Sequence, residues 1–358
     1  MSRRHRLSRI TFIVLAMAVT MAVVLKGATD PRGTEITRYR NAFLIQPGSN
    51  ADFEWTPSSI PADYLQERAS IPEELANWHG FARTGDTLTR SVAIARGLSI
   101  KPRRGDPIQQ STVVTLDTIE TVGTGYCADY TRVFSALAYA AGIPVREWAF
   151  SFDGFGGHGH IFNEVWDREN KRWLMIDVFH GFYPRDAQIG TPLSALEFRR
   201  RLTSAPDTIG WERLTPSHFA FKTDAEALDY YRRGTAEWYL WWGSNPLSYD
   251  QQPLVAGASQ LGHLPEQVAA ILTGTLPKFK VLMTEQNRRA FERLIWLKYR
   301  LLTAAALEVF LAVMLLWNLA GWFRESAFRS QLRFNVSTEP KDPQASPTSG
   351  SSLKRSHR

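Results

Sequence analysis

A cysteine, a histidine and an aspartate near the middle of the sequence are residue types that together perform nucleophilic catalysis. Cys127 is the single cysteine of this 358-residue chain, so it has no internal disulfide partner and cannot belong to a cysteine zinc cluster. Such a cysteine is either a small buried apolar residue or a working thiol. The choice depends on how the surrounding elements place it relative to His160 and Asp177.

The sequence around Cys127 predicts the start of a helix. The turn GTGY leads into CADYTRVFSALAYAAG, where Val133 and Leu137 recur at helical spacing, and Gly142 and Pro144 end the helix. The unpaired N–H groups and the positive dipole end at a helix start favour a negatively charged sulfur. A structural cysteine more often lies within the apolar stripe, so the position by itself leaves both roles open.

Three segments with alternating side chains follow the helix and predict an antiparallel sheet. The predicted strands are VREWAFSF at 145–152, HIFNEVW at 160–166 and RWLMIDVF at 172–179. The Gly-rich DGFGGHG at 153–159 is the first connecting loop, and DREN at 167–170 is the second. A helix followed by an antiparallel sheet predicts the α+β class.

The second and third strands place His160 and Asp177 on one face, because side chains alternate along a strand with period two. With DREN as the turn, Trp166 pairs with Lys171 and His160 pairs with Asp177. A shift by one pair would leave them diagonal neighbours on that face. A carboxylate fixes the tautomer of an imidazole, which can then act as base for a thiol. We therefore predict a catalytic triad of Cys127, His160 and Asp177.

These segments resemble the motifs of the transglutaminase-like superfamily. GYCADYTRVFSALAYAAGIPVREW is similar to its cysteine motif, HIFNEVW to its histidine strand and RWLMIDVF to its aspartate strand. The resemblance implies an α+β papain-like, transglutaminase-like core, in which the helix bearing the cysteine packs on an antiparallel sheet. It also implies Cys127 as nucleophile, His160 as general base and acid, and Asp177 as the residue that orients His160.

Three residues beside the triad are candidates for binding a substrate: His158, Tyr126 and Phe162. His158 lies in the Gly-rich loop two residues before His160, and the alternative is an exposed loop histidine. Phe162 stands where the family commonly has Trp, which would alter the wall of the pocket. The backbone N–H of Cys127 is the expected first donor to an oxyanion.

Other polar and aromatic residues are expected to be structural. Arg146 is expected to pair with a nearby carboxylate, and Asn163 and Glu164 to support the strands and the domain interior. Aromatic residues gather at 228–249, where core packing is the first expectation and stacking on sugar rings the alternative. This group includes Trp238, Trp241 and Trp242.

Two apolar segments predict membrane anchors. Residues 10–25 carry no charge and follow a basic N-terminus, which predicts a signal peptide or a signal anchor. No clean cleavage site follows, so an uncleaved anchor is the first expectation. Residues 301–323 are long enough to span a bilayer, although Glu308 and Asn318 leave a buried helix of a soluble domain as the alternative. The basic N-terminus places the start of the chain in the cytoplasm. We therefore expect an inner-membrane protein whose catalytic domain is periplasmic or otherwise extracytoplasmic.

This topology divides the chain into segments. We expect a cytoplasmic N-terminus at 1–9, a transmembrane anchor at 10–25, a linker at 26–60, an exported domain at 61–300 with its core motifs at 123–186 and a helical extension, a transmembrane helix at 301–323, and a disordered cytoplasmic tail at 324–358. Helices are expected within 62–98 and at 193–202, 224–242, 264–273 and 283–300, a helix or strand at 111–119, and a short edge strand near 42–45.

The function that these residues predict is acyl transfer from an amide or peptide bond through a thioester. Hydrolysis, as by a protease, amidase or deamidase, is the first expectation, and cross-linking to an amine is also open. The substrate would be a peptide or protein amide, in an envelope or polysaccharide-associated setting. A non-catalytic envelope scaffold that retains the fold is the alternative.

Other function classes are disfavoured. A metal hydrolase built on His158, His160, Asp177 and His180 lacks a recognised ligand spacing, and we expect no metal and no cofactor. The formal charge of +7 comes with no nucleic-acid-binding signature, so we expect no nucleic acid as partner.

Overall fold

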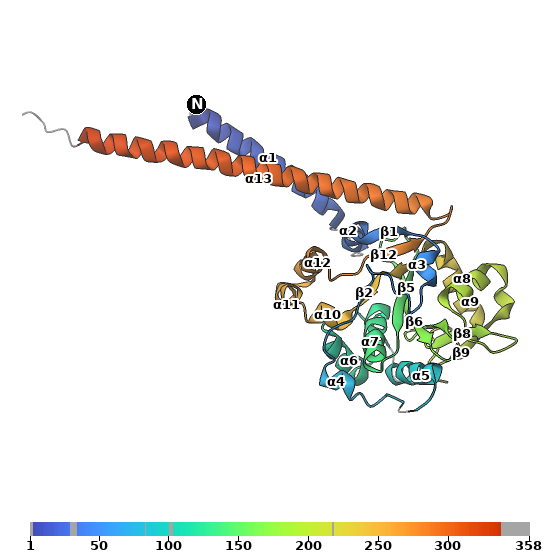
Figure 1. The fold of residues 1–358 in the computed structure, drawn as a ribbon. Helices are drawn as coiled ribbons and strands as arrows, with labels where there is room; N and C mark the ends of the chain where they lie inside the picture. The colour runs from blue at the N-terminus through green and yellow to red at the C-terminus, as the bar shows by residue number, and fades with distance from the viewer. Residues whose placement is uncertain (1–2, 29–33, 83, 100–102, 217, 338–358) are drawn as a thin grey trace, which may run out of the picture. The chain divides into compact units, whose positions relative to one another are not determined.

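The computed structural model describes residues 3–28, 34–82, 84–99, 103–216 and 218–337. The chain divides into two units: Lys26–Leu302 forms one, and Met1–Leu25 with Thr303–Arg358 forms the other. The first unit contains the predicted triad, and its helices and strands are labelled in Figure 1.

A six-stranded sheet forms the centre of the Lys26–Leu302 unit. The edge strand β1 runs parallel to its neighbour β12, and each of the other neighbouring strands is antiparallel. In spatial order the strands are β1 (Ile45–Gly48), β12 (Phe279–Leu282), β10 (Trp238–Trp241), β5 (Val145–Ser151), β6 (Gly159–Asp167) and β7 (Arg172–Ile176). The expected edge strand near 42–45 therefore begins at Ile45, because residues up to Leu44 belong to helix α2 (Thr34–Leu44).

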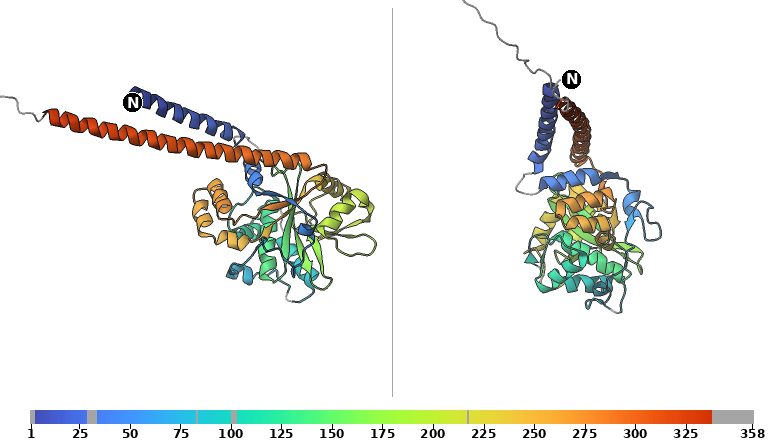
Figure 2. Two further views of the ribbon diagram at one scale, coloured as in Figure 1. Left: turned by 45° about the horizontal axis from the view of Figure 1, so that its top comes forward. Right: turned by 90° about the vertical axis from the view of Figure 1, so that its left-hand side faces the viewer.

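Helices cover both faces of this sheet (Figures 1 and 2). On one face, α7 (Cys127–Ala140) packs with α5 (Thr87–Leu98) and α6 (Thr112–Thr121), and Phe134 and Leu137 join Val165 and Leu174 in one apolar cluster. On the other face, α8 (Ala195–Ser204) and α9 (Asp224–Gly234) enclose an aromatic cluster. The stripe predicted around Cys127 is thus the face by which α7 contacts the sheet.

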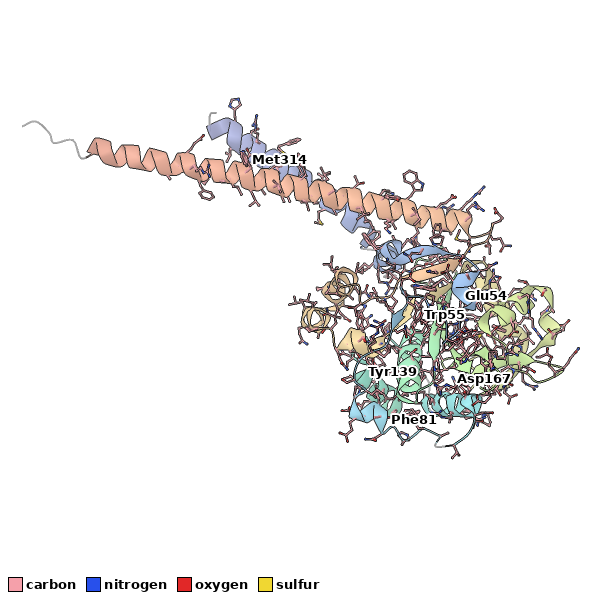
Figure 3. The ribbon with its side chains drawn as sticks, viewed as in Figure 1. Glu54, Trp55, Phe81, Tyr139, Asp167 and Met314 are labelled. Carbon is pink, nitrogen blue, oxygen red and sulfur yellow. The ribbon has the colours of Figure 1, made fainter. Side chains whose placement is uncertain are left out.

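The hairpin between β6 and β7 turns one residue later than predicted. Trp166 pairs with Trp173 and Asp167 with Arg172, so the turn is residues 168–171 rather than DREN. Asp167, labelled in Figure 3, stays in β6 because its Oδ1 accepts from the backbone N–H groups of Glu169 and Asn170, each at 3.1 Å. The predicted pairing of Trp166 with Lys171 was therefore wrong by two residues along β7, a shift that leaves every side chain on its predicted face.

Tertiary contacts overrode local helical patterns at two other places. Within the predicted helical stretch 62–98, Leu65 and Gln66 form strand β2, which pairs with β11 (Gly243–Ser244). The predicted helix 224–242 ends at Gly234, and residues from Trp238 form β10. A Cβ atom at Gly234 would lie 2.2 Å from the Phe150 ring, so a glycine is required where α9 approaches the sheet.

The remaining elements connect these layers. Residues 111–119, which allowed a helix or a strand, lie almost wholly in helix α6. The other elements of the unit are α3 (Ala51–Glu54), α4 (Glu73–Ala76), β3 (Arg103–Arg104), β4 (Thr124–Gly125), β8 (Phe182–Asp186), η1 (Pro206–Thr208), β9 (Ile209–Arg213), η2 (Thr235–Glu237), α10 (Pro246–Asp250), α11 (Pro253–Ser259) and α12 (His263–Leu272).

A buried ion pair links β5 to β6 on the aromatic face. Arg146 Nε donates to Glu164 Oε2 at 2.6 Å, and Arg146 Nη1 donates to the Phe53 carbonyl at 2.9 Å. Glu164 also accepts from Trp148 Nε1 at 2.7 Å and from the Ala195 backbone N–H at 2.8 Å. Three indole rings surround the guanidinium: Trp55 (labelled in Figure 3), Trp148 and Trp173. This arrangement confirms the structural roles expected of Arg146 and Glu164.

The tryptophans at 238–242 pack mainly within the domain. Trp238 and Trp242 are buried in the aromatic cluster, with exposed fractions of 0% and 2%. Trp241 is half-buried, with its ring centroid 5.4 Å from that of Phe279. Core packing, the first expectation, therefore accounts for this group, and Trp238 and Trp242 present no surface on which a sugar could stack.

The second unit consists of helical segments near the ends of the chain. Helix α1 (Arg3–Ala28) contains the apolar stretch Leu7–Ala22. Helix α13 (Arg288–Ser337) begins in the first unit, and its stretch Arg288–Ala327 is long and apolar enough to cross a membrane, with a mean hydropathy of 1.9 in its apolar window. Only 6% of that window is buried, which differs from the core helix of a soluble domain.

Candidate active site

Cys127 is the first residue of helix α7, where the sequence placed it. The preceding Tyr126 has an extended backbone, and its N–H donates to Asp129 Oδ2 at 2.8 Å, which fixes the start of the helix. The same carboxylate oxygen accepts from the Ile108 backbone N–H at 3.1 Å. The Cys127 side chain thus lies at the positive end of a well-capped helix and is 6% exposed.

His160 and Asp177 lie in direct contact on the aromatic face of the sheet. His160 Nε2 is 2.5 Å from Asp177 Oδ2, and both side chains are buried. The observed register of β6 and β7 places Asp177 one diagonal step from His160 when it is continued past Ile176. The diagonal arrangement, which the sequence allowed as the alternative register, is therefore the one observed.

The electrostatics of the pair favour an imidazolium beside a carboxylate. Burial lowers the pKa of His160, but attraction to Asp177 and hydrogen bonds with Asp177 and Cys127 outweigh burial and raise the pKa to about 9. Burial raises the pKa of Asp177, but attraction to His160 and His180 outweighs burial and holds the pKa well below its usual range. Each group is therefore stabilised in its charged form by the other.

The contacts also assign the two ring nitrogens of His160. Nε2 faces Asp177, so Nδ1 is the ring nitrogen left for an interaction with the Cys127 thiol, which contributes to raising the pKa of His160. An ionised carboxylate only accepts hydrogen bonds, so Nε2 must carry a proton. The arrangement can therefore take a proton from Cys127 at Nδ1 while Asp177 stabilises the resulting imidazolium.

Two residues that sequence reasoning did not place in the site also contact Asp177. The Tyr231 hydroxyl donates to Asp177 Oδ2, and the His180 backbone N–H donates to Oδ1 at 2.9 Å. The His180 ring stacks on the His160 ring, with centroids 4.0 Å apart. The sequence had suggested His180 only as a ligand of the disfavoured metal site, whereas nothing in the sequence pattern of α9 distinguishes Tyr231.

The three predicted substrate-binding residues lie in different surroundings. Tyr126 is 43% exposed, and its ring lies 6.4 Å from that of Phe179, so it borders the surface next to Cys127. His158 is exposed in the loop before β6, with its ring 5.5 Å from that of Phe152. Phe162 has an exposed fraction of 0% and stacks behind the His160 ring, so it supports that ring and a substrate has no access to it.

A metal ion is the other ligand to consider, because His160, Asp177 and His180 offer ligand atoms within 4.8 Å of one another. Zinc bound at about 2.1 Å in a tetrahedron would hold its ligand atoms roughly 3.4 Å apart. His160 Nε2 and Asp177 Oδ2 are closer than this, at 2.5 Å, and make a direct hydrogen bond. His158, the fourth residue considered, is exposed in its loop rather than part of the cluster. The donor set therefore fits a hydrogen-bonded network better than a shared metal ion.

Comparisons with known proteins agree with the motifs. The pattern of the transglutaminase-like superfamily matches residues 86–178. A crystal structure from Cytophaga hutchinsonii, described as a "putative cysteine protease", is 22% identical with a TM-score of 0.24, and the match covers 30% of this chain and 36% of that chain. The similarity thus spans about a third of that protein, and no curated protein matches this chain. The matched residues 86–178 include Cys127, His160 and Asp177, so this part of the chain is similar to the transglutaminase-like superfamily.

Proposed function

We propose that this protein is a membrane-anchored, cysteine-dependent acyl-transfer enzyme that acts on an amide or peptide bond. The observation that carries the proposal is the buried His160–Asp177 pair, together with a thiol at the start of α7 that contributes to the raised pKa of His160. A structural cysteine has no need of an imidazole held by a carboxylate. The superfamily match over the same residues supports this assignment.

The proposed reaction proceeds in two balanced steps. The reaction starts from a thiolate–imidazolium pair in which His160 Nδ1 already holds the thiol proton, and the Cys127 sulfur attacks the amide carbonyl carbon so that a C–S bond forms. The C–N bond then breaks as His160 returns the proton to the leaving amine. Water next attacks the thioester, His160 takes its proton and gives it to the departing sulfur, and a carboxylic acid is released. An amine in place of water would give a new amide, which is the cross-linking outcome.

Asp177 and the helix start have defined roles in these steps. Asp177 holds the Nε2 proton of His160 and stabilises the imidazolium that forms when Cys127 is ionised. The backbone N–H of Cys127 is at the first position of α7, where a helix offers its N–H groups no intrahelical partner, so it can donate to the developing oxyanion. Tyr126, exposed beside the sulfur, is the residue best placed to contact a bound peptide.

The anchoring part of the proposal rests on the terminal helices. The exposed apolar stretch of α13 has the length and hydropathy of a membrane span, and the uncharged segment 10–25 follows a basic N-terminus. In the proposed topology residues 26–300 lie outside the cytoplasmic membrane and both ends of the chain are cytoplasmic. The substrate is then a peptide or protein amide of the cell envelope.

Trapping the acyl-enzyme tests the chemistry with generic acyl donors in place of the natural substrate. The full chain in detergent would be incubated with a pool of acyl-donor amides and peptides, and its intact mass measured. We expect a hydroxylamine-sensitive adduct that maps to Cys127 and is absent from Cys127→Ala. Turnover of any of these donors by purified Cys127→Ala at the wild-type rate would contradict the proposal. Absence of an adduct together with absence of turnover would favour the scaffold alternative.

A further inference from the structure

We propose that Tyr231 and His180 are positioning residues of this active site, and that a directed chain of hydrogen bonds from His180 through Tyr231 to Asp177 orients the pair formed by Asp177 and His160. This inference rests on the proposed cysteine chemistry and extends the site beyond its three predicted members. It also gives a function to part of the chain outside the superfamily match, because Tyr231 belongs to α9 and the match ends at residue 178.

The direction of each hydrogen bond follows from the donors and acceptors available. Asp177 is ionised, so its oxygens only accept, and the Tyr231 hydroxyl must donate its single proton to Oδ2. The Tyr231 oxygen can then only accept from His180 Nδ1, which lies 2.7 Å away. His180 must therefore carry a proton on Nδ1. The chain thus runs His180 Nδ1–H to Tyr231 O–H to Asp177, with His160 Nε2–H donating to the same carboxylate from the other side.

The network compensates for the burial of Asp177. The carboxylate has an exposed fraction of 0%, and such burial favours a protonated acid unless hydrogen bonds and nearby positive charge favour the ion. Three donors hydrogen-bond to it, namely His160 Nε2, the Tyr231 hydroxyl and the His180 backbone N–H, and His180 Nδ1 lies 3.4 Å from Oδ2. The Tyr231 hydroxyl and His160 Nε2 both contact Asp177 Oδ2. Removal of the hydroxyl would therefore take one hydrogen bond away from the carboxylate and would let the oxygen that orients the imidazole move.

The surroundings of both residues restrict their movement. The His180 and His160 rings are nearly parallel, 19° apart with centroids 4.0 Å apart, so the position of one limits the tilt of the other. Tyr231 is fully buried, and the rings of Phe182 and Phe198 lie 5.5 and 5.3 Å from its ring. A phenol held by packing on all sides presents its hydroxyl at a fixed point, as a residue that orients a catalytic group must.

Removing only the Tyr231 hydroxyl separates this role from core packing. Tyr231→Phe keeps the buried ring, and Tyr64→Phe is a matched control, because Tyr64 is also buried in the aromatic cluster but contacts Trp55 and Trp242 rather than the triad. The first readout is the rate of Cys127 alkylation by iodoacetamide, which is specific because the chain has one cysteine. We expect Tyr231→Phe to slow alkylation roughly tenfold at neutral pH, the size expected for one hydrogen bond to a charged group, and Tyr64→Phe to leave it unchanged.

The second readout is the tautomer of each histidine, from long-range ¹⁵N–¹H spectra of ¹⁵N-histidine-labelled full-length protein in detergent. We expect a proton on His180 Nδ1 in the wild type and in Tyr64→Phe, and its loss or redistribution in Tyr231→Phe. His180→Ala would assign the resonance. If Tyr231→Phe fails to fold, the wild-type spectrum still tests the predicted direction of the chain.

The outcomes distinguish this inference from the proposed function. An unprotonated His180 Nδ1 in the wild type, or alkylation and tautomers unchanged in Tyr231→Phe, would overturn the positioning role while leaving the triad intact. Equal alkylation of wild type and His160→Ala would instead contradict the proposed cysteine chemistry itself.

Discussion

Two buried charged pairs lie on the same face of the sheet and both use residues of β6, yet they differ in their neighbours. Arg146 and Glu164 are bonded to each other, to backbone groups and to an indole N–H. His160 and Asp177 are also buried and bonded, but the Cys127 thiol contributes to the raised pKa of His160. We infer that one strand provides a structural pair and a pair suited to catalysis.

The largest effect is expected from a substitution that removes the charge of Asp177 in the pair with His160 but keeps the shape of the side chain. Asp177→Asn keeps the volume but removes the negative charge that stabilises the His160 imidazolium, and an amide can present N–H to the ring and reverse its tautomer. We expect acyl transfer to fall by about 10⁴-fold. Rate measurements on the donor used to trap the acyl-enzyme would check this. A loss of less than about tenfold would show that Asp177 does not orient His160.

Breaking the pair of Arg146 and Glu164 should lower the stability of the fold rather than the rate of acyl transfer. Glu164→Ala leaves Arg146 buried without its carboxylate, and we expect the free energy of unfolding to fall by about 3–5 kcal/mol. Chemical denaturation of the Lys26–Leu302 unit in the full chain would measure this, with Glu197→Ala as a control because the Arg172–Glu197 pair is partly exposed. A change of under about 1 kcal/mol in Glu164→Ala would contradict the account of this pair.

The pH dependence of stability provides a further contrast, because the pair of His160 and Asp177 includes a group whose pKa is raised above neutrality by folding. The pKa of His160 is raised to about 9, so its contribution to stability is fully present below the unfolded value of about 6.5 and is lost as pH rises through about 9. We expect the denaturation midpoint to fall over this range in the wild type and to change less in Asp177→Asn. Identical pH profiles would mean that the pair does not hold His160 charged.

The smallest expected effect concerns Glu147, a half-buried residue on the opposite face of the sheet. Burial raises the pKa of Glu147 to about 7, although a hydrogen bond from Ser135 at 2.6 Å and attraction to Arg132 lower it. Its neutral form is favoured in the fold, so stability should fall as pH rises from the unfolded value of about 4.5 through about 7. Glu147→Gln should flatten the stability profile in this range. If stability falls with pH as steeply in Glu147→Gln as in the wild type, other titratable groups must cause the fall.

Local pattern was sufficient for the elements that carry the predicted triad. The helix stripe after Cys127 and the alternation in 145–179 depend on contacts between neighbouring segments, so α7 and strands β5, β6 and β7 lie close to their predicted bounds. The turn was displaced by one residue because the Asp167 side chain caps it from within β6. This displacement kept His160 and Asp177 on the same face, so the predicted contact between them did not depend on the exact position of the turn.

The features of the fold and the site that the sequence did not predict depend on contacts between distant parts of the chain. No periodicity in α9 distinguishes Tyr231 from an ordinary core tyrosine, and its contact with Asp177 exists only because α9 folds back on the sheet. The segment around Leu65 has helical spacing, but pairing with β11 made it a strand. The end of α9 depends on how closely Gly234 approaches Phe150, a steric requirement that a single sequence does not reveal.

The most direct test of the central claim is labelling of membranes with an electrophilic thiol probe at neutral pH, followed by peptide mapping. The account predicts strong labelling at Cys127 in the wild type and a decrease of at least about tenfold in His160→Ala, because the imidazole generates the reactive sulfur. Equal labelling of the two proteins, or a wild-type Cys127 that does not react while the domain is folded, would contradict it.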